Sequence, residues 1–195
     1  PKTILFNFWY FPFKDAIRLP VYVSHRVWLM RMAGSVDLAV VRSGVVRIGF
    51  GDVGIFDRQR QRSIWQVSGQ VTFNGEAKIG HGSKISVTGN LVLGDNFCVS
   101  AESALVAHDK ITIGDNVLVS WDVLVMDSDH HHILNESGEC INPSKAVLIG
   151  NNVWVGCRSV ILKGVSIADG VVVSAGTALT KSILTNNVIV GGGGG

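Results

Sequence analysis

The chain has 195 residues, of which 47% are hydrophobic, so it can bury one core and does not require a second domain. Its 17 basic and 15 acidic residues give a formal charge of +2, without a long Lys or Arg run. This balance lacks the electrostatic signature of nucleic-acid or anionic-membrane binding. Three cysteines without CxxC spacing (Cys98, Cys140 and Cys157) fit a reducing compartment better than a disulfide framework. We therefore expect a cytoplasmic protein.

The first 65 residues lack any short period and hold most of the basic and aromatic residues. The apolar segment from Thr3 to Phe13 is too short to span a bilayer and has no small-residue cleavage pattern. Pro20 then breaks any long helix, and residues 38–50 alternate like a strand. We expect residues 1–65 to form an N-terminal cap or arm. Peripheral contact with the inner face of a membrane is the alternative to simple packing, because aromatic residues such as Trp9 suit an interface.

A six-residue period of apolar residues runs through the rest of the chain. It is clearest at Ile149, Val155, Ile161, Ile167, Val173 and Leu179. An α-helix has no reason for this spacing, whereas a fixed short period is typical of a solenoid whose repeats bury their apolar sides by stacking. The same period appears at Leu93, Val99 and Leu105 and, after a two-residue offset, at Ile113, Val119 and Val125.

The prediction is an all-β parallel β-helix over residues 66–190, followed by a glycine tail at residues 191–195. Three hexapeptides would complete one triangular coil, and roughly five or six coils would stack about 4.8 Å apart. Dipeptides such as Gly94-Asp95 mark the corners. Alternation along the strands predicts six side chains that face inward: Val153, Val155, Val165, Ile167, Val171 and Val173.

Residues 127–146 interrupt the period. They contain the sequence DSDHHH and Pro143 before the period resumes at Val147. An insertion in a solenoid normally protrudes as a loop, and protruding loops on rigid scaffolds often carry function. We therefore expect the chemistry of the protein near this loop.

The histidines of this loop are the natural general bases, because an imidazole has a reference pKa of about 6.5. In an extended segment, His130 and His132 would lie on one side and His131 on the other. Asp127 and Asp129 would either support the base and its substrate or cap turns of the loop. These five residues also offer metal ligands, but neighbouring residues diverge, whereas zinc ligands converge from separated positions. We therefore predict no metal.

The period, the loop and the run IGNNVWVGCRSVILKGVSIADGVVVSAGTALTK at Ile149–Lys181 together resemble the hexapeptide-repeat O-acetyltransferases, which are left-handed β-helix enzymes. The likeness is closest to the acetyltransferases of capsule, lipopolysaccharide and exopolysaccharide synthesis, which carry a segment similar to WDVLVMDSDHHHI at Trp121–Ile133. The resemblance alone implies a left-handed coil, because parallel crossovers are otherwise almost always right-handed. It also implies a homotrimer with each active site between two subunits and acetyl-CoA as the acyl donor.

The matching loop of the resembling enzymes reads Asp-x-Asp-aromatic-His, which assigns the general base to His131. His130 then stands where an aromatic residue usually lies and would contact the acceptor. Asp127 and Asp129 would act with His131, by accepting a hydrogen bond from the imidazole or by holding a sugar hydroxyl. Ser100 falls near a position where relatives keep a polar residue for the acceptor.

The resemblance further implies that the backbone N–H of Cys157, after Trp154 and Gly156, donates to the oxyanion of the thioester. A covalent acyl-cysteine at Cys157 is the rival use of that residue. The other coenzyme A contacts implied by the resemblance are Ser174, Ala175, Thr180 and Lys181.

The predicted function is direct transfer of acetyl from acetyl-CoA to a sugar hydroxyl of a cell-surface polysaccharide or its precursor. The alternatives are N-acetylation of an amino sugar, a non-catalytic trimeric β-helix scaffold and a metal-dependent hydratase. The sequence departs from the resembling enzymes after residue 190, where Gly191–Gly195 replace a Gly-Asn-Pro-Ala-Lys-like element. Five glycines supply no side chain for coenzyme A.

Overall fold

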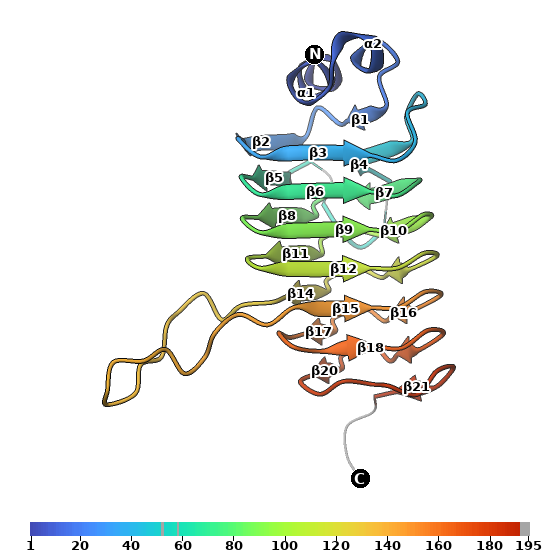
Figure 1. Cartoon of the computed structure of the whole chain (residues 1–195). Helices are drawn as coiled ribbons and strands as arrows, with labels where there is room; N and C mark the ends of the chain where they lie inside the picture. The colour runs from blue at the N-terminus through green and yellow to red at the C-terminus, as the bar shows by residue number, and fades with distance from the viewer. Residues whose placement is uncertain (52, 58, 192–195) are drawn as a thin grey trace.

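A computed structural model describes residues 1–51, 53–57 and 59–191 and contains two short helices followed by a column of short strands (Figure 1). Of the glycine tail expected at residues 191–195, only Gly191 lies within the described residues. The strands form three parallel sheets, here named A, B and C, which are the faces of a triangular solenoid. None of the helices in these ranges is long and apolar enough to cross a bilayer.

Each sheet takes about every third strand, because the chain visits the three faces in turn. Sheet A contains β1 (Val21–Val23), β4 (Val46–Phe50), β7 (Ala77–Gly80), β10 (Phe97–Val99), β13 (Leu118–Val119), β16 (Trp154–Val155), β19 (Val172–Val173) and β21 (Ile189–Val190). Sheet B contains β2 (Val27–Met32), β5 (Ser63–Val67), β8 (Lys84–Val87), β11 (Ala104–Ala107), β14 (Leu124–Met126), β17 (Val160–Ile161) and β20 (Ala178–Leu179). Sheet C contains β3 (Ser35–Leu38), β6 (Gln70–Phe73), β9 (Asn90–Leu93), β12 (Lys110–Ile113), β15 (Val147–Ile149) and β18 (Ser166–Ile167). The prediction of an all-β parallel β-helix is confirmed.

The coil is left-handed. In Figure 1 the strands of sheet C run from left to right in front, and the chain then returns from right to left behind them as it descends. This path confirms the handedness that the family resemblance implied.

The two-residue offset in the period reflects two lengths of coil. In sheet B, Ile85 pairs with Leu105 and Leu105 with Val125, so these coils contain 20 residues. Ile161 pairs with Leu179, so the coil there contains 18 residues, which is three hexapeptides. The extra residues lengthen the strands. Strands β11 and β12 in the longer coils have four residues each, whereas β17 and β18 in the shorter coils have two.

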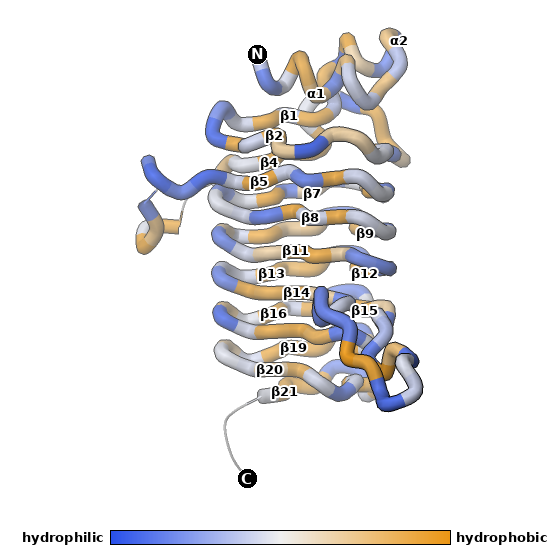
Figure 2. Tube along the Cα trace, turned by 90° about the vertical axis from the view of Figure 1, so that its left-hand side faces the viewer, coloured by the Kyte–Doolittle hydropathy of each residue, from blue (hydrophilic) through white to orange (hydrophobic). Residues whose placement is uncertain are grey.

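Alternate side chains of each strand point inward and form one continuous core. The six side chains expected to face inward are at most 3% exposed: Val153, Val155, Val165, Ile167, Val171 and Val173. Near the N-terminal end, the core also contains the fully buried aromatic rings of Trp65, Phe73 and Phe97. Figure 2 shows hydrophobic segments along the strands and hydrophilic segments at many of the corners. Burial of these stacked rows holds the coils together.

The β-helix begins earlier than the six-residue period indicated. Strands β1 to β4, within the residues expected to form the cap or arm, belong to the same three sheets. Register shifts within the pairs that β2 and β4 make with their neighbours obscure the period in the sequence. Of the described elements, only α1 (Lys2–Tyr10) and α2 (Phe13–Ala16) lie over the end of the solenoid (Figure 1).

Buried aromatic and amide side chains seat α1 on the first coils. The rings of Phe6 and Trp65 lie 5.2 Å apart, edge to face, and Trp65 Nε1 donates to the Tyr10 hydroxyl at 3.1 Å. Asn7 Nδ2 donates to the Val21 carbonyl at 2.6 Å, and Asn7 Oδ1 accepts the Val21 N–H at 3.0 Å. Helix α1 therefore closes the N-terminal end of the core.

The corner between sheets C and A is held by a ladder of Asp and Asn side chains. Asp95 N–H donates to Asp115 Oδ1 at 2.7 Å, Asp115 N–H to Asn151 Oδ1 at 2.8 Å, and Asn151 N–H to Asp169 Oδ1 at 2.6 Å. The residue after each turn Asp or Asn adopts a left-handed backbone, as at Asn116 (φ 56°), which asparagine tolerates well. This geometry explains the recurring Gly-Asp-Asn turns of the sequence.

Candidate functional site

Residues 127–146 leave the solenoid at the corner between sheets B and C, here named corner BC, and protrude as predicted (Figure 1). The two arms of this loop contact each other. Leu134 and Cys140 form an antiparallel bridge, and Ile141 N–H donates to the Ile133 carbonyl at 2.8 Å. The loop is therefore a two-armed projection with backbone hydrogen bonds of its own.

Asp127 lies at the base of the loop, where its side chain is fully buried. Its two carboxylate oxygens accept the backbone N–H groups of His108 and Asp109, each at 2.8 Å. In the coil above, a backbone carbonyl fills the same role, because the N–H groups of Thr88 and Gly89, which are equivalent to those of His108 and Asp109, donate to the Ala107 carbonyl at 2.9 and 3.2 Å. The Asp127 carboxylate thus replaces a carbonyl where the chain departs into the loop. These contacts are those of a residue that caps a turn.

Asp129 is part of a polar network that fixes the loop to the solenoid. Its Oδ2 accepts hydrogen bonds from Lys163 Nζ at 2.5 Å and from Asn142 Nδ2 at 2.8 Å. These two hydrogen bonds hold the pKa of the Asp129 carboxyl below its ordinary value, and the bond from Lys163 has the larger effect. Lys163 Nζ also donates to the carbonyls of Asn142 and Pro143, at 3.0 and 3.3 Å. One lysine therefore binds both arms of the loop.

Asn142 fixes the backbone around His131. Its Nδ2 donates to the His131 carbonyl at 2.8 Å, and its Oδ1 accepts the Ile133 N–H at 2.6 Å. The His131 side chain itself is exposed. The backbone is therefore held while the imidazole can meet a group from outside the chain.

The loop histidines line a small pocket of about 60 Å³ together with His108. His130 has a φ of 59°, so the chain turns there and the alternation of an extended strand does not apply. The prediction that His130 and His132 face away from His131 is therefore wrong, because all three line this pocket. The His108 ring lies 6.2 Å from that of His130, and His108 Nδ1 lies 3.3 Å from Ser144 Oγ.

Most residues expected to contact coenzyme A or the acceptor lie at the corner between sheets A and B, here named corner AB. Ser100, Gly156 and Ser174 occupy one column there, each donating its N–H to the end of the next strand of sheet A at 2.7–2.9 Å. A Cβ at Gly156 would lie 2.6 Å from the backbone nitrogen of Ala175, so this position requires glycine. Ala175 is exposed beside the column. The small residues leave this edge of the solenoid open.

Trp154 and Cys157 flank Gly156 at the same corner. The Trp154 side chain is 50% exposed, and its Nε1 donates to Ser120 Oγ at 3.0 Å. The half-buried Cys157 accepts the Gly176 N–H at its carbonyl, at 2.8 Å. Within residues 1–51, 53–57 and 59–191, the Cys157 N–H donates no hydrogen bond.

Thr180 and Lys181 follow β20 and are exposed at corner BC, away from Ser174. The register of β14, β17 and β20 places Lys163 and Lys181 in successive coils below Asp127. The pair expected to meet the coenzyme A phosphates therefore lies on the corner that carries the loop.

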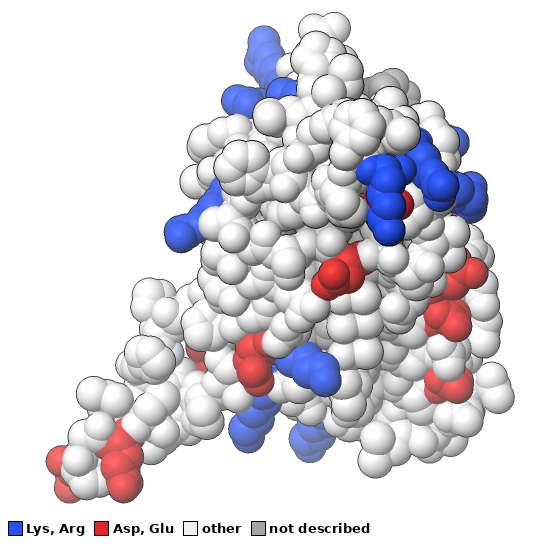
Figure 3. Space-filling model, turned by 45° about the horizontal axis from the view of Figure 1, so that its top comes forward, with Lys and Arg blue, Asp and Glu red and all other residues white. Residues whose placement is uncertain are grey.

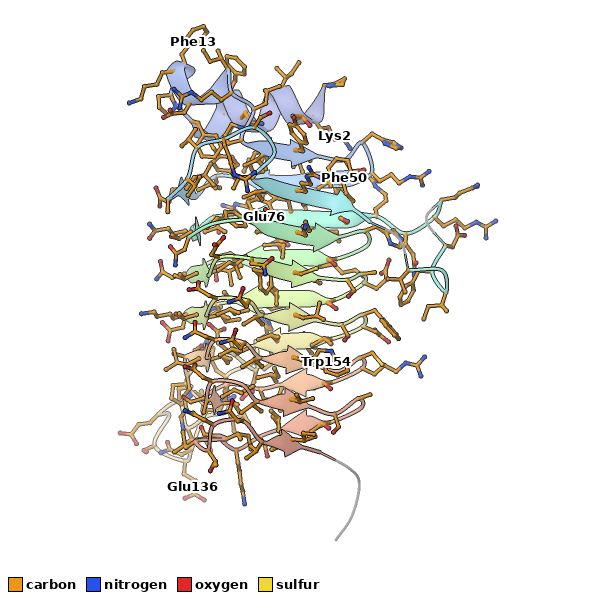
Figure 4. All side chains as sticks on the ribbon, turned by 90° about the vertical axis from the view of Figure 1, so that its right-hand side faces the viewer. Lys2, Phe13, Phe50, Glu76, Glu136 and Trp154 are labelled. Carbon is orange, nitrogen blue, oxygen red and sulfur yellow. The ribbon has the colours of Figure 1, made fainter. Side chains whose placement is uncertain are left out.

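The expected site residues thus form two groups on different corners of one chain. The loop with His131 stands at corner BC, whereas Ser100 and the segments 154–157 and 174–175 lie at corner AB, so the width of sheet B separates the groups. Figure 4 shows Trp154 on sheet A and Glu136, at the tip of the loop, well away from it. A single chain does not bring His131 to the open column.

In the described part of the chain, no three His, Cys, Asp or Glu side chains gather as metal ligands. The nearest sulfur–imidazole approach in the loop is a pair, His132 Nδ1 and Cys140 Sγ, at 3.4 Å. The expectation that the protein needs no metal stays a prediction.

The comparisons with known proteins agree on the kind of solenoid. A family model described as bacterial transferase hexapeptide (six repeats) matches residues 146–181. Galactoside O-acetyltransferase from Escherichia coli K12 is 40% identical over 104 residues, which cover 52% of this chain and 50% of that protein. The putative lipopolysaccharide biosynthesis O-acetyl transferase WbbJ from the same organism is 31% identical over 134 residues, which cover 63% of this chain and 68% of WbbJ. The chain belongs to the hexapeptide-repeat O-acetyltransferases.

A solved structure of this family has the same fold. The crystal structure of the polySia-specific acetyltransferase NeuO matches with a TM-score of 0.50 and 23% identity, over 85% of this chain and 68% of that chain. The chain spans about half the length of the galactoside enzyme. The comparisons therefore establish the family and the fold of this hexapeptide-repeat chain.

Sequence reasoning missed three residues that shape the site, namely Asn142, Lys163 and His108. Asn142 looks like an ordinary turn residue before Pro143, and Lys163 like a solvated corner lysine. His108 lies in a different coil from the loop, 36 residues before its partner Ser144. The interruption of the period was a signal for the loop, but it did not show which side chains brace it.

Proposed function

We propose that the protein transfers acetyl from acetyl-CoA to a hydroxyl of a saccharide, in a cell-surface polysaccharide or its precursor. The observation that carries this proposal is the exposed His131, whose flanking backbone is fixed by Asn142 on a loop anchored by Lys163. Relatives named for O-acetyl transfer to galactosides and in lipopolysaccharide biosynthesis support the acceptor class.

In the proposed reaction His131 is the general base. One imidazole nitrogen accepts the proton of the sugar hydroxyl as the hydroxyl oxygen forms a bond to the acetyl carbonyl carbon. Acetyl-CoA supplies this acetyl group as a thioester, whose C–S bond then breaks. The Cys157 N–H donates to the oxyanion of the tetrahedral intermediate. His131 finally gives its proton to the departing thiolate, which leaves the base as it began.

The residues at corner AB fit a thin acyl chain. Gly156 lies where a Cβ would meet backbone, and Gly176, with φ of 71°, has open space where its Cβ would be. Ser174 and Ala175 would line the pantetheine arm along this edge. Thr180 and Lys181 would meet the phosphates, because a lysine at an exposed corner can pair with them as a point charge.

Asp129 and Asp127 contribute by positioning in this proposal. Asp129 holds Asn142 and Lys163, which fix the segment that carries His131. Asp127 caps the corner from which the loop leaves. His130 and Ser100 are proposed to contact the acceptor, from the loop and from the open column respectively.

We also propose a homotrimer, in which the loop of one subunit reaches corner AB of the next. The outer face of sheet A carries a row of exposed apolar side chains, Leu118, Trp154 and Ile189, that a neighbouring subunit would cover. Subunit contact would also join the two groups of site residues that a single chain keeps apart.

We place the proposed reaction on the cytoplasmic side, because acetyl-CoA is available there and because three free cysteines fit a reducing compartment. Peripheral contact with the membrane is part of this proposal. Helices α1 and α2 expose Trp9 and Phe13, which are 62% and 72% exposed. Ten of the 17 basic residues lie in the first 62 positions, against four of the 15 acidic ones. Figure 3 shows Lys and Arg side chains around this capped end.

Calorimetric titration with acetyl-CoA, run beside a transfer assay with saccharide acceptors, tests the proposed function. We expect saturable binding in the natural protein and in His131→Ala, with acetyl transfer in the variant lower by about 10²–10⁴-fold. His25→Ala is the matched control, because His25 is exposed near the capped end. Unchanged transfer in His131→Ala would overturn the choice of base, and no acetyl-CoA binding in either protein would overturn the function.

A further inference from the structure

A cavity of about 340 Å³ lies on the outer face of sheet A, beside Phe50, Gly51 and Val53. Its lining includes Arg47, Lys78, Cys98 and Ser100. Its volume falls within the range of small-ligand pockets, whereas the histidine pocket is about 60 Å³. Ser100 connects the cavity to the open column at corner AB, where acyl transfer is proposed.

Two cations share one wall of this cavity. In the parallel register of β4, β7 and β10, Arg47 lies beside Lys78 and Lys78 beside Cys98 on neighbouring strands. These three side chains therefore form a row on the outer face of sheet A. Adjacent parallel strands lie about 4.8 Å apart, which brings the arginine and the lysine close enough to act on the same ligand group. Like charges side by side repel unless an anion lies between them.

The protein neutralises these cations only in part. Glu76 accepts from Lys78 Nζ at 3.1 Å and from Arg42 at 3.0 Å, and these hydrogen bonds lower the pKa of its carboxyl. Arg47 is exposed and, among the residues that the structure describes, has no ion pair. No carboxylate belongs to the described lining of the cavity. Among the described residues, the charged groups on and beside this wall are Arg42, Arg47 and Lys78 against Glu76, and these sum to a net positive charge.

The remaining lining suits a sugar ring. Phe50 is 42% exposed and offers an apolar face on which the C–H side of a pyranose can lie. Ser100 supplies a hydroxyl that can donate to or accept from a sugar hydroxyl. An arginine fork matches a carboxylate or phosphate with two parallel hydrogen bonds.

We propose that this cavity binds an acidic sugar unit of the acceptor, with the anionic group at Arg47 and Lys78 and the ring against Phe50. This inference rests on the proposed function for its role, because it names the class of saccharide that receives the acetyl group. Neutral saccharides have no anionic group to bind Arg47 and Lys78.

The test measures binding of saccharides without catalysis, so that it stays informative even if the protein transfers no acetyl group. A uronic-acid oligosaccharide, its carboxyl-reduced neutral counterpart and a sugar phosphate are titrated into the natural protein, Arg47→Gln and Arg31→Gln. Arg31 is also an exposed arginine, on sheet B, and is the matched control. A second variant, Lys78→Gln, checks the other cation.

We expect the acidic oligosaccharide to bind at least tenfold more tightly than its reduced counterpart. Arg47→Gln should weaken binding of the acidic oligosaccharide by about 10–100-fold and leave acetyl-CoA binding unchanged. Arg31→Gln should bind the acidic oligosaccharide as tightly as the natural protein does. Binding of the sugar phosphate alone would also support the proposal and would identify phosphate as the anion. Equal binding of acidic and neutral saccharides, or equal loss in Arg47→Gln and Arg31→Gln, would overturn it.

Discussion

Asn142 is the residue on which the position of His131 depends most directly. One amide side chain donates to Asp129 and to the His131 carbonyl, both at 2.8 Å, and accepts from the Ile133 N–H at 2.6 Å. Its nitrogen and its oxygen are therefore both used within the loop. A catalytic base misplaced by a fraction of an ångström loses much of its effect, so such bracing matters for turnover.

The exchange Asn142→Asp tests this dependence at the scale of one residue. The carboxylate keeps the size of the amide but loses both donors and places a negative charge against Asp129. We expect acetyl transfer to fall by about 10–100-fold while acetyl-CoA binding stays within twofold, as transfer assays and calorimetry would show. Asn135→Asp, at the loop tip, is the matched control. Normal transfer in Asn142→Asp would show that the loop holds His131 by other means.

The functional residues that could be predicted are those whose signal is local in the sequence. The DSDHHH segment interrupts a regular period, which predicted the protruding loop, and the family resemblance then selected His131 within it as the candidate base. Asn142 and Lys163 act across 11 and 34 residues, on His131 and Asp129 respectively. Such partners depend on the coil register, which the sequence pattern does not resolve. The turn at His130 was missed for a similar reason, because a single left-handed residue reverses the alternation.

The helical cap presents exposed apolar side chains next to cations. Helix α1 turns Phe6 and Asn7 into the core and leaves Ile4, Leu5 and Phe8 exposed. The cations Lys14 and Arg18 lie on or next to α2. An apolar face bordered by cations is the arrangement that binds the interface of an anionic bilayer.

Vesicle flotation tests this element. We expect the protein to float with vesicles that contain anionic lipid and to bind neutral vesicles more weakly. The exchange Phe13→Glu should reduce partitioning by about 10–100-fold, because burial of one Phe side chain contributes about 1.5–3 kcal/mol. Leu184→Glu, at an exposed site near the other end of the molecule, is the control. No flotation with either kind of vesicle would contradict membrane contact.

At the scale of elements, the sequence predicted the later coils better than the first ones. Between Val147 and Leu179 the coils follow the hexapeptide period closely, so their core residues could be assigned one by one. The strands before residue 51 contain register shifts and long connections that remove the period. Their membership in sheets A, B and C is set by pairing with the next coil, and this pairing has no short-range signature.

In the molecule as a whole, the proposed site residues lie in two groups on different corners of the solenoid. Corner BC presents the braced histidine loop, and corner AB presents the open column with Gly156 and Ala175. Sheet B separates the two corners, and the apolar row of Leu118, Trp154 and Ile189 on sheet A is exposed in a single chain. A closed trimer meets both conditions at once, because each corner AB then receives the loop of a neighbour.

Subunit complementation tests this account most directly. His131→Ala removes the proposed base, and Ala175→Trp blocks the exposed edge of the column, so each variant alone should be inactive. In trimers mixed at random from equal amounts, about one quarter of the sites would combine a natural loop with a natural column from the neighbouring subunit. We predict that acetyl transfer returns to about a quarter of the natural rate. Mixed trimers that remain inactive would contradict a site shared between subunits.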